Sequence, residues 1–464
     1  MSRRGVVMVA VLMVVVLATM VAMGLMFYMR SEVAASAAQV RGEQAYHAAL
    51  SGLRLAMTVL QSAGGDMTVW YDNPEIFMNQ LVADDGTNRW FFIVYADDGS
   101  DVGVMRCGAT DEAGKVNLNT LPAESLMALP NMTAELASCL MDYREPGADP
   151  RPDGAKQDYY DTLQYPYVIA NGPLTSMDEM LLIKGFTAGI IYGEDANQNG
   201  LLDPGEDDGD DSFPPDNRDG KLDRGLRGVA TVYSSEPNTG TNGRARINMN
   251  GSASSLSGAG LPAQALALIA AYRADGNTFQ HPSELLEMQY TLKQSVQATV
   301  GGAPTTLPPG SVIQSGVTAS NLATVLDRLT AAADPTKPVV GLVNVNTASA
   351  EVLSVMPGMD ANLAQQIVDV RRDLDPSVGT SIAWLYTQNV LTADQFKAVA
   401  PYLTARSMQY SVRCIGFGYP CGRYRILEAV LDYSGSTPRI AYLRDITQLG
   451  LPFALDPDQL ERTQ

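Results

Sequence analysis

The sequence predicts an α+β protein in which a long N-terminal helix packs on an antiparallel sheet and a large α-helical domain is inserted into that sheet. Three observations lead to this fold class. An uncharged apolar run near the N-terminus continues into an amphipathic helical pattern. Segments rich in β-branched and aromatic residues lie near both ends of the chain. Between them, a short asparagine-containing segment recurs three times ahead of helix-forming sequence.

The apolar run is expected to cross a membrane as a helix. No charged residue occurs from Gly5 to Met29, which is long enough to span a hydrocarbon core of roughly 30 Å. Apolar residues then recur at spacings of three or four, at Ala45, Ala49, Leu53, Ala56 and Leu60. Arg3 and Arg4 precede the run, so the positive-inside rule places the N-terminus in the cytoplasm. We therefore assign residues 6–29 to a transmembrane helix and residues 30–62 to its soluble half.

Strand-like segments follow this helix and also end the chain. They are rich in β-branched and aromatic residues, with turn residues between them, and they occupy residues 89–98, 102–110, 408–418, 423–433 and 439–446. The simplest arrangement is one platform sheet built from residues 63–112 and 406–464. Residues 113–405 would then form the inserted α-helical domain.

The inserted domain contains a repeated element. The segments KVNLNT, RINMNG and LVNVNT end at Thr120, Gly251 and Thr347. After the first and third, helical sequence turns at Leu129–Pro130 and Met356–Pro357 and continues as a second helix, which resembles a helix-hairpin-helix module. We expect the asparagines to cap helices and turns. Hairpins of this kind hold a phosphate in DNA-binding proteins, but few lysines lie nearby, which favours a packing unit.

The most specific chemical signal is DANQNGLLDPGE, residues 195–206, which matches an EF-hand calcium loop. Gly200 occupies the sixth position, where the loop turns sharply, and Leu201 offers its carbonyl at the seventh. Side-chain oxygens fill the other ligand positions, at Asp195, Asn197, Asn199, Asp203 and Glu206. Pro204 and Gly205 make a following helix unfavourable, so we expect a calcium-folded loop without the helix pair of a sensor. A solvated acidic loop is the alternative.

A second, incomplete loop follows in the same acidic segment, which extends to residue 223. When Gly220 is placed at the sixth position, Pro215 falls at the first and supplies no carboxylate. Asp216, Asp219 and Asp223 remain as candidates for a second ion. The negative charges of this segment repel one another when no cation is bound. Bound calcium would therefore add to the folding free energy.

Composition fits an exported, ordered protein. The chain has 464 residues, a formal net charge of −19 and a sequence pI of about 4.5. This length allows about two or three domains. An acidic chain repels nucleic acid phosphates, so we expect no nucleic acid partner.

Two of the four cysteines are candidates for a disulfide. Cys414 and Cys421 flank IGFGYP, which we interpret as a turn, so they could face each other across a hairpin. In an oxidising compartment we expect them to pair, and two buried free thiols are the alternative. Cys107 and Cys139 have no such partner in the pattern.

The sequence contains no catalytic constellation. His47 lies in the N-terminal helix and His281 precedes Pro282 at an expected helix start, so neither belongs to a recognisable triad. A nucleotide-binding glycine loop is also absent from the sequence. We therefore expect a protein that is not an enzyme.

A short basic leader ending in glycine, followed by a membrane helix that continues into a soluble one, resembles the type IV pilins. Together with the N-x-N segments, the hairpin units and the acidic loop, it resembles the minor pseudopilin K family of type II secretion (general secretion pathway protein K). This resemblance implies a pilin fold with an inserted helical domain and bound calcium. It also implies that prepilin peptidase removes residues 1–5 by cutting between Gly5 and Val6. Relative to this family, the RINMNG unit is extra, which predicts an enlarged inserted domain.

The family resemblance also implies a role. Most pilins carry a glutamate at the fifth mature position, here Ala10, and the K pseudopilins typically lack it. The implied function is a pseudopilus tip that starts assembly with two smaller minor pseudopilins, I-like and J-like. The implied location is the bacterial inner membrane, crossed once, with the bulk in the periplasm. The alternatives are a type IV pilus or DNA-uptake minor pilin that uses its hairpins on DNA, and an exported calcium-dependent enzyme.

Overall fold

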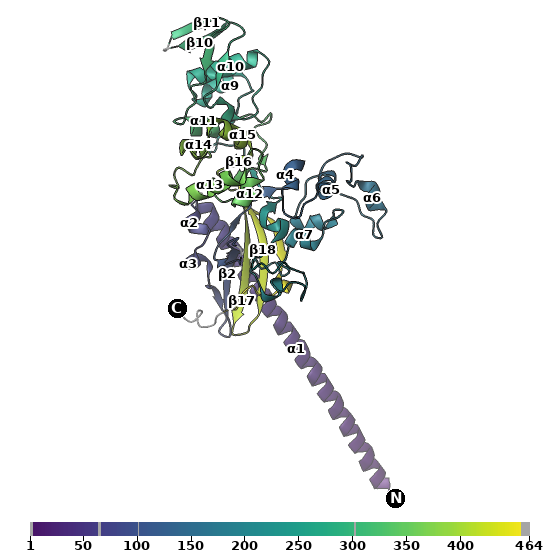
Figure 1. The fold of residues 1–464 in the computed structure, drawn as a ribbon. Helices are drawn as coiled ribbons and strands as arrows, with labels where there is room; N and C mark the ends of the chain where they lie inside the picture. Colours follow the sequence, from purple (N-terminus) through teal and green to yellow (C-terminus); the bar gives the residue numbers. More distant parts are fainter. Residues whose placement is uncertain (1–2, 64–65, 101, 301–302, 456–464) are drawn as a thin grey trace.

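The computed structural model describes residues 3–63, 66–100, 102–300 and 303–455, and it confirms the predicted fold class (Figure 1). Helix α1 (Arg3–Ala63) projects away from the molecule at its N-terminal end and lies against a sheet at its C-terminal end. The five apolar positions predicted for its soluble face are at most 7% exposed: Ala45, Ala49, Leu53, Ala56 and Leu60. In contrast, every side chain from residue 7 to residue 29 is exposed.

The main sheet is antiparallel and joins the two ends of the chain. Its strand order is β1-β2-β17-β18-β19, with β3 paired to β2 and β4 paired to β17. The bounds are β1 (Gln80–Asp84), β2 (Arg89–Asp97), β3 (Met105–Arg106), β4 (Thr110–Asp111), β17 (Gln409–Tyr419), β18 (Tyr424–Asp432) and β19 (Arg439–Asp445). Strands β2, β17, β18 and β19 coincide with segments that the sequence predicts as strands. The chain between β4 and β17 forms the inserted region.

The inserted region combines short helices with two-stranded ladders. Its α-helices are α4 (Ala123–Met127), α5 (Ala134–Arg144), α6 (Gln157–Asp161), α7 (Ala188–Tyr192), α8 (Gly225–Val229), α9 (Ala253–Leu256), α10 (Ala263–Ala274), α11 (Leu322–Arg328), α12 (Ala350–Ser354), α13 (Ala361–Arg372), α14 (Trp384–Thr387) and α15 (Ala393–Val399). Two further helices, α2 (Met67–Trp70) and α3 (Pro74–Phe77), precede the sheet. The ladders are β5 (Val116–Asn117) with β6 (Ala230–Thr231), β7 (Ser235–Glu236) with β14 (Val339–Val340), β8 (Ile247–Asn248) with β13 (Leu329–Thr330), β9 (Gln289–Thr291) with β12 (Val312–Gln314), β10 (Val296–Val300) with β11 (Ala303–Leu307), and β15 (Val343–Asn344) with β16 (Leu403–Thr404).

Three of these ladders are parallel, and each closes one repeated unit. We define unit 1 as residues 116–231, unit 2 as residues 247–330 and unit 3 as residues 343–404. In every unit the predicted asparagine segment begins the unit and pairs in parallel with the strand that ends it. Figure 1 shows unit 2 farthest from the N-terminus of α1, unit 3 between unit 2 and the sheet, and unit 1 as a lateral arm.

The two asparagines of each repeat have different roles. The first makes a local turn, with its Oδ1 accepting the amide of the second at 2.8–3.0 Å, in Asn117, Asn248 and Asn344. The second binds a backbone distant in sequence. Asn119 holds both backbone groups of Leu174, at 2.7 and 3.1 Å, and Asn250 holds those of Phe279, at 3.0 and 2.8 Å. Asn346 donates to the Gly379 carbonyl at 2.8 Å. The side chain of the second asparagine therefore joins two parts of the chain that are distant in sequence, a contact that we call a long-range bracket. It is not the helix cap that we expected.

Units 1 and 3 each contain two tight helical hairpins, and unit 2 contains one. Their turns hold a residue with positive φ, which places it in the left-handed region that glycine and asparagine tolerate best. These residues are Asn131 and Gly185 in unit 1, Gly260 in unit 2, and Gly358 and Asn389 in unit 3. In unit 2 the strands β9 to β12 separate η5 (Pro282–Leu285) from α11, where a second hairpin would lie. The predicted hairpins at 129–130 and 356–357 are two of these five.

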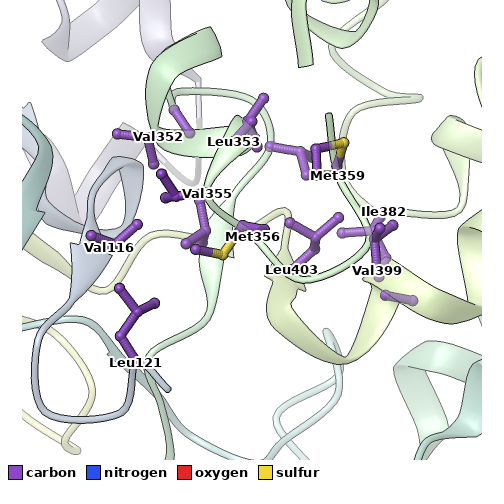
Figure 2. Close-up of a cluster of buried hydrophobic side chains, with 14 of the residues drawn as sticks. Val116, Leu121, Val352, Leu353, Val355, Met356, Met359, Ile382, Val399 and Leu403 are labelled. Carbon is purple, nitrogen blue, oxygen red and sulfur yellow. The ribbon is translucent and has the colours of Figure 1, made fainter. Parts of the chain in front are cut away.

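The core of the inserted region is continuous across the units. Val116 and Leu121 of unit 1 lie close to Val355 and Met356 of unit 3 in one buried cluster (Figure 2). A carboxylate adds a polar tie, since Asp111 of β4 accepts hydrogen bonds from three side chains: Asn344 at 2.9 Å, and Thr347 and Ser407 at 2.5 Å each. Unit 3 is therefore anchored to the sheet by a buried aspartate.

The predicted disulfide between Cys414 and Cys421 is wrong, because both cysteines are free. Cys414 is buried in the middle of β17, and the strand continues straight through the segment that we interpreted as a turn. The extended strand from Cys414 to Tyr419 separates the two cysteines. At about 3.3 Å per residue, the distance between the Cα atoms of Cys414 and Cys421 then exceeds the roughly 7 Å limit for a disulfide. The glycines in this segment serve close packing: a Cβ on Gly416 would lie 2.1 Å from the carbonyl oxygen of Ala45 in α1.

Candidate metal loop and membrane helix

The acidic loop predicted to bind calcium begins two residues after helix α7 and its Gly193 cap. Gly200, the predicted sharp turn, has φ +78°, which is a conformation that glycine adopts without strain. The loop ends in the short 3-10 helix η3 (Pro204–Glu206), and the chain does not continue as an EF-hand helix. Sequence and structure therefore agree on an isolated loop.

The first three candidate ligands accept hydrogen bonds from nearby backbone amides and so form short side-chain turns. The two oxygens of Asp195 accept the amides of Asn199 at 2.8 Å and Gly200 at 3.0 Å. Asn197 Oδ1 accepts the Asn199 amide at 2.9 Å, and Asn199 Oδ1 accepts the Leu201 amide at 2.6 Å. A carbonyl or carboxylate oxygen has a second acceptor site, so these contacts leave capacity for a cation.

The last two candidate ligands close the loop. Asp203 Oδ2 accepts the side-chain amides of Asn197 at 2.7 Å and Asn199 at 2.8 Å. Glu206 Oε1 accepts the Ala196 amide at 3.0 Å, and its Oε2 accepts the Asp203 amide at 3.1 Å. The carboxylate at the twelfth position thus reaches back across the loop to its beginning.

Electrostatics within this loop disfavour its negative charges. Burial raises the pKa of Asp195. Burial, together with the nearby carboxylates of Asp195 and Asp203, raises the pKa of Glu206 to about 7. A cation bound among these oxygens would remove the penalty, because it favours the ionised form of each carboxylate.

The side chains are not gathered as a carboxylate cage. Among the described residues, no group of three or more His, Cys, Asp or Glu side chains is placed so that it could hold a metal ion. The candidate set instead combines three carboxylates with two amide oxygens and the Leu201 carbonyl. This mixed oxygen set suits calcium, which accepts amide and backbone oxygens as well as carboxylates.

The second candidate site is only partly assembled. Asp216 accepts three backbone amides, from Asp208, Gly209 and Arg218. Asp219 and Asp223 each accept the amide two residues downstream, from Lys221 and Gly225. Glu194, which belongs to neither predicted ligand set, lies beside this group, because its Oε2 accepts the Asp223 amide at 3.2 Å. Burial and the charges of Asp223 and Asp216 raise the pKa of Glu194. No spacing signal could have found Glu194, because it precedes the EF-hand register.

The membrane helix carries the predicted processing site. The bond between Gly5 and Val6 lies in the first turns of α1, which begins at Arg3. Among the described residues, one helix is long and apolar enough to cross a membrane, and the searched part of it extends from Val7 to Ala63. Its most apolar stretch is not buried inside the molecule. This long apolar helix is consistent with membrane anchoring.

Comparisons with known proteins identify two segments of the chain. Residues 110–192 match the family model described as "Type II secretion system (T2SS), protein K". Residues 340–404, close to the bounds of unit 3, match the "Helix-hairpin-helix motif" model. One similar solved structure is a chain in a crystal structure of the GspK-GspI-GspJ complex of the type 2 secretion system from enterotoxigenic Escherichia coli. It has 12% identity and a TM-score of 0.37, over 88% of this chain and 99% of that chain. No curated protein matched the sequence.

Proposed function

We propose that this chain, whose residues 110–192 match the protein K family of type II secretion systems, is the minor pseudopilin at the tip of a pseudopilus. In this role it is a structural subunit and not an enzyme. It starts assembly in the inner membrane with an I-like and a J-like minor pseudopilin. The observation that carries the proposal is the combination of the protein K segment with an exposed apolar helix at the N-terminus.

The size and composition of the chain support a terminal position. The inserted region is much larger than the sheet that carries it, so a second copy stacked above the first in a thin filament would collide with it. The apolar half of α1 also has no carboxylate, and Ala10 stands where a glutamate would neutralise the amine of a neighbour. An unpaired charge in lipid is costly, so a subunit without an upper neighbour gains by omitting it.

The proposed topology is a single membrane crossing with the sheet and the inserted region in the periplasm. Arg3 and Arg4 precede the apolar run and support a cytoplasmic N-terminus. Prepilin peptidase then cuts between Gly5 and Val6. N-terminal sequencing of the protein purified from membranes should begin at Val6, whereas a mature end beyond Met29 would mean an ordinary signal peptide and would exclude a pseudopilin.

Co-purification tests the partners. The full-length chain is expressed with the two smaller minor pseudopilins of its own gene cluster and recovered from membranes by a tag on this chain. We expect both partners in the eluate. The control carries Val14→Arg in the membrane helix, which should reduce recovery because a charge at the bilayer centre is unfavourable. Recovery of this chain without either partner would contradict the assembly role.

We further propose that Asp195, Asn197, Asn199, Asp203, Glu206 and the Leu201 carbonyl hold a calcium ion. Support comes from the EF-hand spacing, the side-chain turns and the raised pKa of Glu206. Asp216, Asp219 and Asp223, with Glu194, are a weaker candidate for a second ion. We propose no nucleic acid partner, because Glu351 and Asp360 flank the unit 3 hairpin and carry the wrong charge for phosphate.

Calcium titration of the full-length protein in detergent tests the metal proposal. Calcium should raise the melting temperature, since a ligand that binds only the folded state adds about 2.7 kcal/mol at one hundred times its Kd. The double variant Asp195→Ala/Glu206→Ala should lose that rise. Asp210→Ala is the matched control, because Asp210 is an exposed carboxylate in the same segment outside the candidate set. An equal rise in the double variant would exclude this loop.

A further inference from the structure

The inserted region and the main sheet have separate hydrophobic cores with a polar seam between them. The buried apolar side chains of the inserted region form one cluster, and those on the sheet form others. A cavity of about 690 Å³ lies along the seam and is lined by charged side chains from both sides. One aromatic pair crosses the seam, Tyr233 of the inserted region and Tyr442 of β19, with ring centroids 6.1 Å apart. The other contacts described below are polar.

The candidate metal loop lies in this seam and contacts the turn between β2 and β3. The Leu202 amide donates to the Val102 carbonyl at 2.9 Å. Arg224 Nη2 donates to the Ser100 carbonyl at 2.8 Å and to the Gly200 carbonyl at 3.2 Å. One arginine thus joins the sheet turn and the sharp turn of the loop.

Gln198 makes the side-chain contact from the loop to the seam. It occupies the fourth loop position, between the candidate ligands Asn197 and Asn199, and its backbone has φ +54°. Its side chain is 9% exposed and turns to two arginines. Its Oε1 accepts Arg227 Nη1 at 2.6 Å and Arg444 Nη2 at 3.4 Å.

These two arginines belong to opposite sides of the seam. Arg227, on α8 of unit 1, also pairs with Glu428 of β18, and Arg413 of β17 reaches the same carboxylate at 3.1 Å. Arg444, on β19, donates to Asp178 of unit 1 at 2.6 Å. The single carbonyl oxygen of Gln198 therefore lies where an arginine of the sheet and an arginine of the arm meet.

We propose that Gln198 couples the state of the metal loop to the docking of unit 1 on the sheet. The inference rests on the calcium site proposed above. An ion held by Asn197 and Asn199 fixes the backbone on both sides of Gln198, and this holds its amide oxygen between Arg227 and Arg444. Without the ion the loop is freer, the two arginines lose a common acceptor, and the seam loosens. Gln198 is thus a positioning residue and not a metal ligand.

Hydrogen–deuterium exchange of the full-length protein in detergent, with and without calcium, tests this coupling. In the parent protein, calcium should slow exchange by about tenfold both in the loop at 195–206 and in β18 and β19. Gln198→Ala should bind calcium with a Kd within about threefold of the parent. It should keep the protection of the loop but lose that of β19. Gln366→Ala, at an exposed position on α13, should behave as the parent does.

A second variant guards against loss of folding in the first. Arg444→Lys keeps a cation near Asp178 but lacks the planar fork that also reaches Gln198, so it should lose the calcium effect on β19 while the loop stays protected. Protection of β19 by calcium in both variants would overturn the coupling and leave the metal site intact. If calcium changed exchange nowhere in the parent, the metal site and the coupling would both be excluded.

Discussion

Units 1 and 3 share a parallel ladder, a local asparagine turn and a long-range bracket, which together we call the frame. They differ in the segment that leads into the closing strand. In unit 3, the 3-10 turn η6 (Ala400–Tyr402) leads from α15 directly into the closing strand β16. In unit 1, the acidic segment from Gly193 to Arg224 separates α7 from α8 and the closing strand β6. Both units nevertheless make the parallel ladder, the local asparagine turn and the long-range bracket.

The comparison shows which part of the molecule holds the fold and which part we propose responds to calcium. The frame rests on buried apolar side chains and neutral amide brackets, which need no ion. The acidic segment buries carboxylates at unfavourable pKa values, and cations would stabilise it. Unit 3 should therefore be independent of calcium, whereas the arm formed by unit 1 should respond to it.

Asp111→Ala should have the largest effect on the anchoring of unit 3. It removes the acceptor of three side-chain donors, of which Asn344 is buried and Thr347 and Ser407 are half-buried, so we expect a loss of about 3 kcal/mol in the free energy of unfolding. Urea unfolding measures this, and the loss should be the same with and without calcium. Asp373→Ala, an exposed position on the same unit, should change little. If calcium restored the stability of the Asp111→Ala variant, unit 3 would not be independent of calcium and the predicted difference between units 1 and 3 would be wrong.

The long-range brackets of Asn346 and Asn119 test whether units 3 and 1 are stabilised in the same way. Asn346→Ala in unit 3 and Asn119→Ala in unit 1 each leave backbone groups unpaired and should cost about 1–3 kcal/mol. If the frame is shared, the two losses should agree within about 1 kcal/mol in saturating calcium. Thermal unfolding of the two variants decides the point. A negligible loss in either one would mean that its bracket is not part of the frame.

Unit 2 should respond to acid through His281. Burial and the nearby charge of Arg246 lower the pKa of His281 to about 4, against 6.5 in the unfolded chain. As pH falls from about 6.5 toward 4, the unfolded chain binds a proton that the folded chain does not, so stability is lost in this window. We expect a loss of about 1–2 kcal/mol between pH 7.5 and pH 5. His281→Asn keeps a residue favoured at helix N-caps and should remove this part of the slope. An unchanged slope would show that the imidazole is already accessible to protons.

The smallest expected effect is on DNA binding, which should be absent at physiological salt. Unit 3 matches a helix-hairpin-helix model, but the whole chain carries a net charge of −19, which opposes counterion release. Fluorescence anisotropy with labelled duplex DNA measures this. Micromolar binding that weakens steeply with salt would favour the DNA-uptake alternative.

The regular elements could be predicted from the sequence because they carry periodic signals. The spacing from Ala45 to Leu60 identified the buried face of α1, and the aromatic and β-branched runs identified the long strands. The two-residue strands of the units were missed, since a period cannot be read from two residues. The false turn before Cys421 arose because Gly416 serves packing against α1 and not a turn.

The candidate site was predictable only where its chemistry follows sequence spacing. Asp195 to Glu206 fit a known register, so their positions in the loop follow from the sequence alone. Gln198 could not be found this way, because its partner Arg444 comes from a distant segment of the chain. Glu194 could not be found because it lies outside the EF-hand register. Contacts across a domain seam depend on the fold and have no local signature.

The stoichiometry of the native complex tests the central claim of a tip subunit most directly. The full-length chain, purified from membranes with the I-like and J-like pseudopilins of its gene cluster, is analysed by native mass spectrometry. We predict a complex with one copy of each of the three chains. Several copies of this chain in one assembly, or a polymer of this chain alone, would contradict a position at the tip.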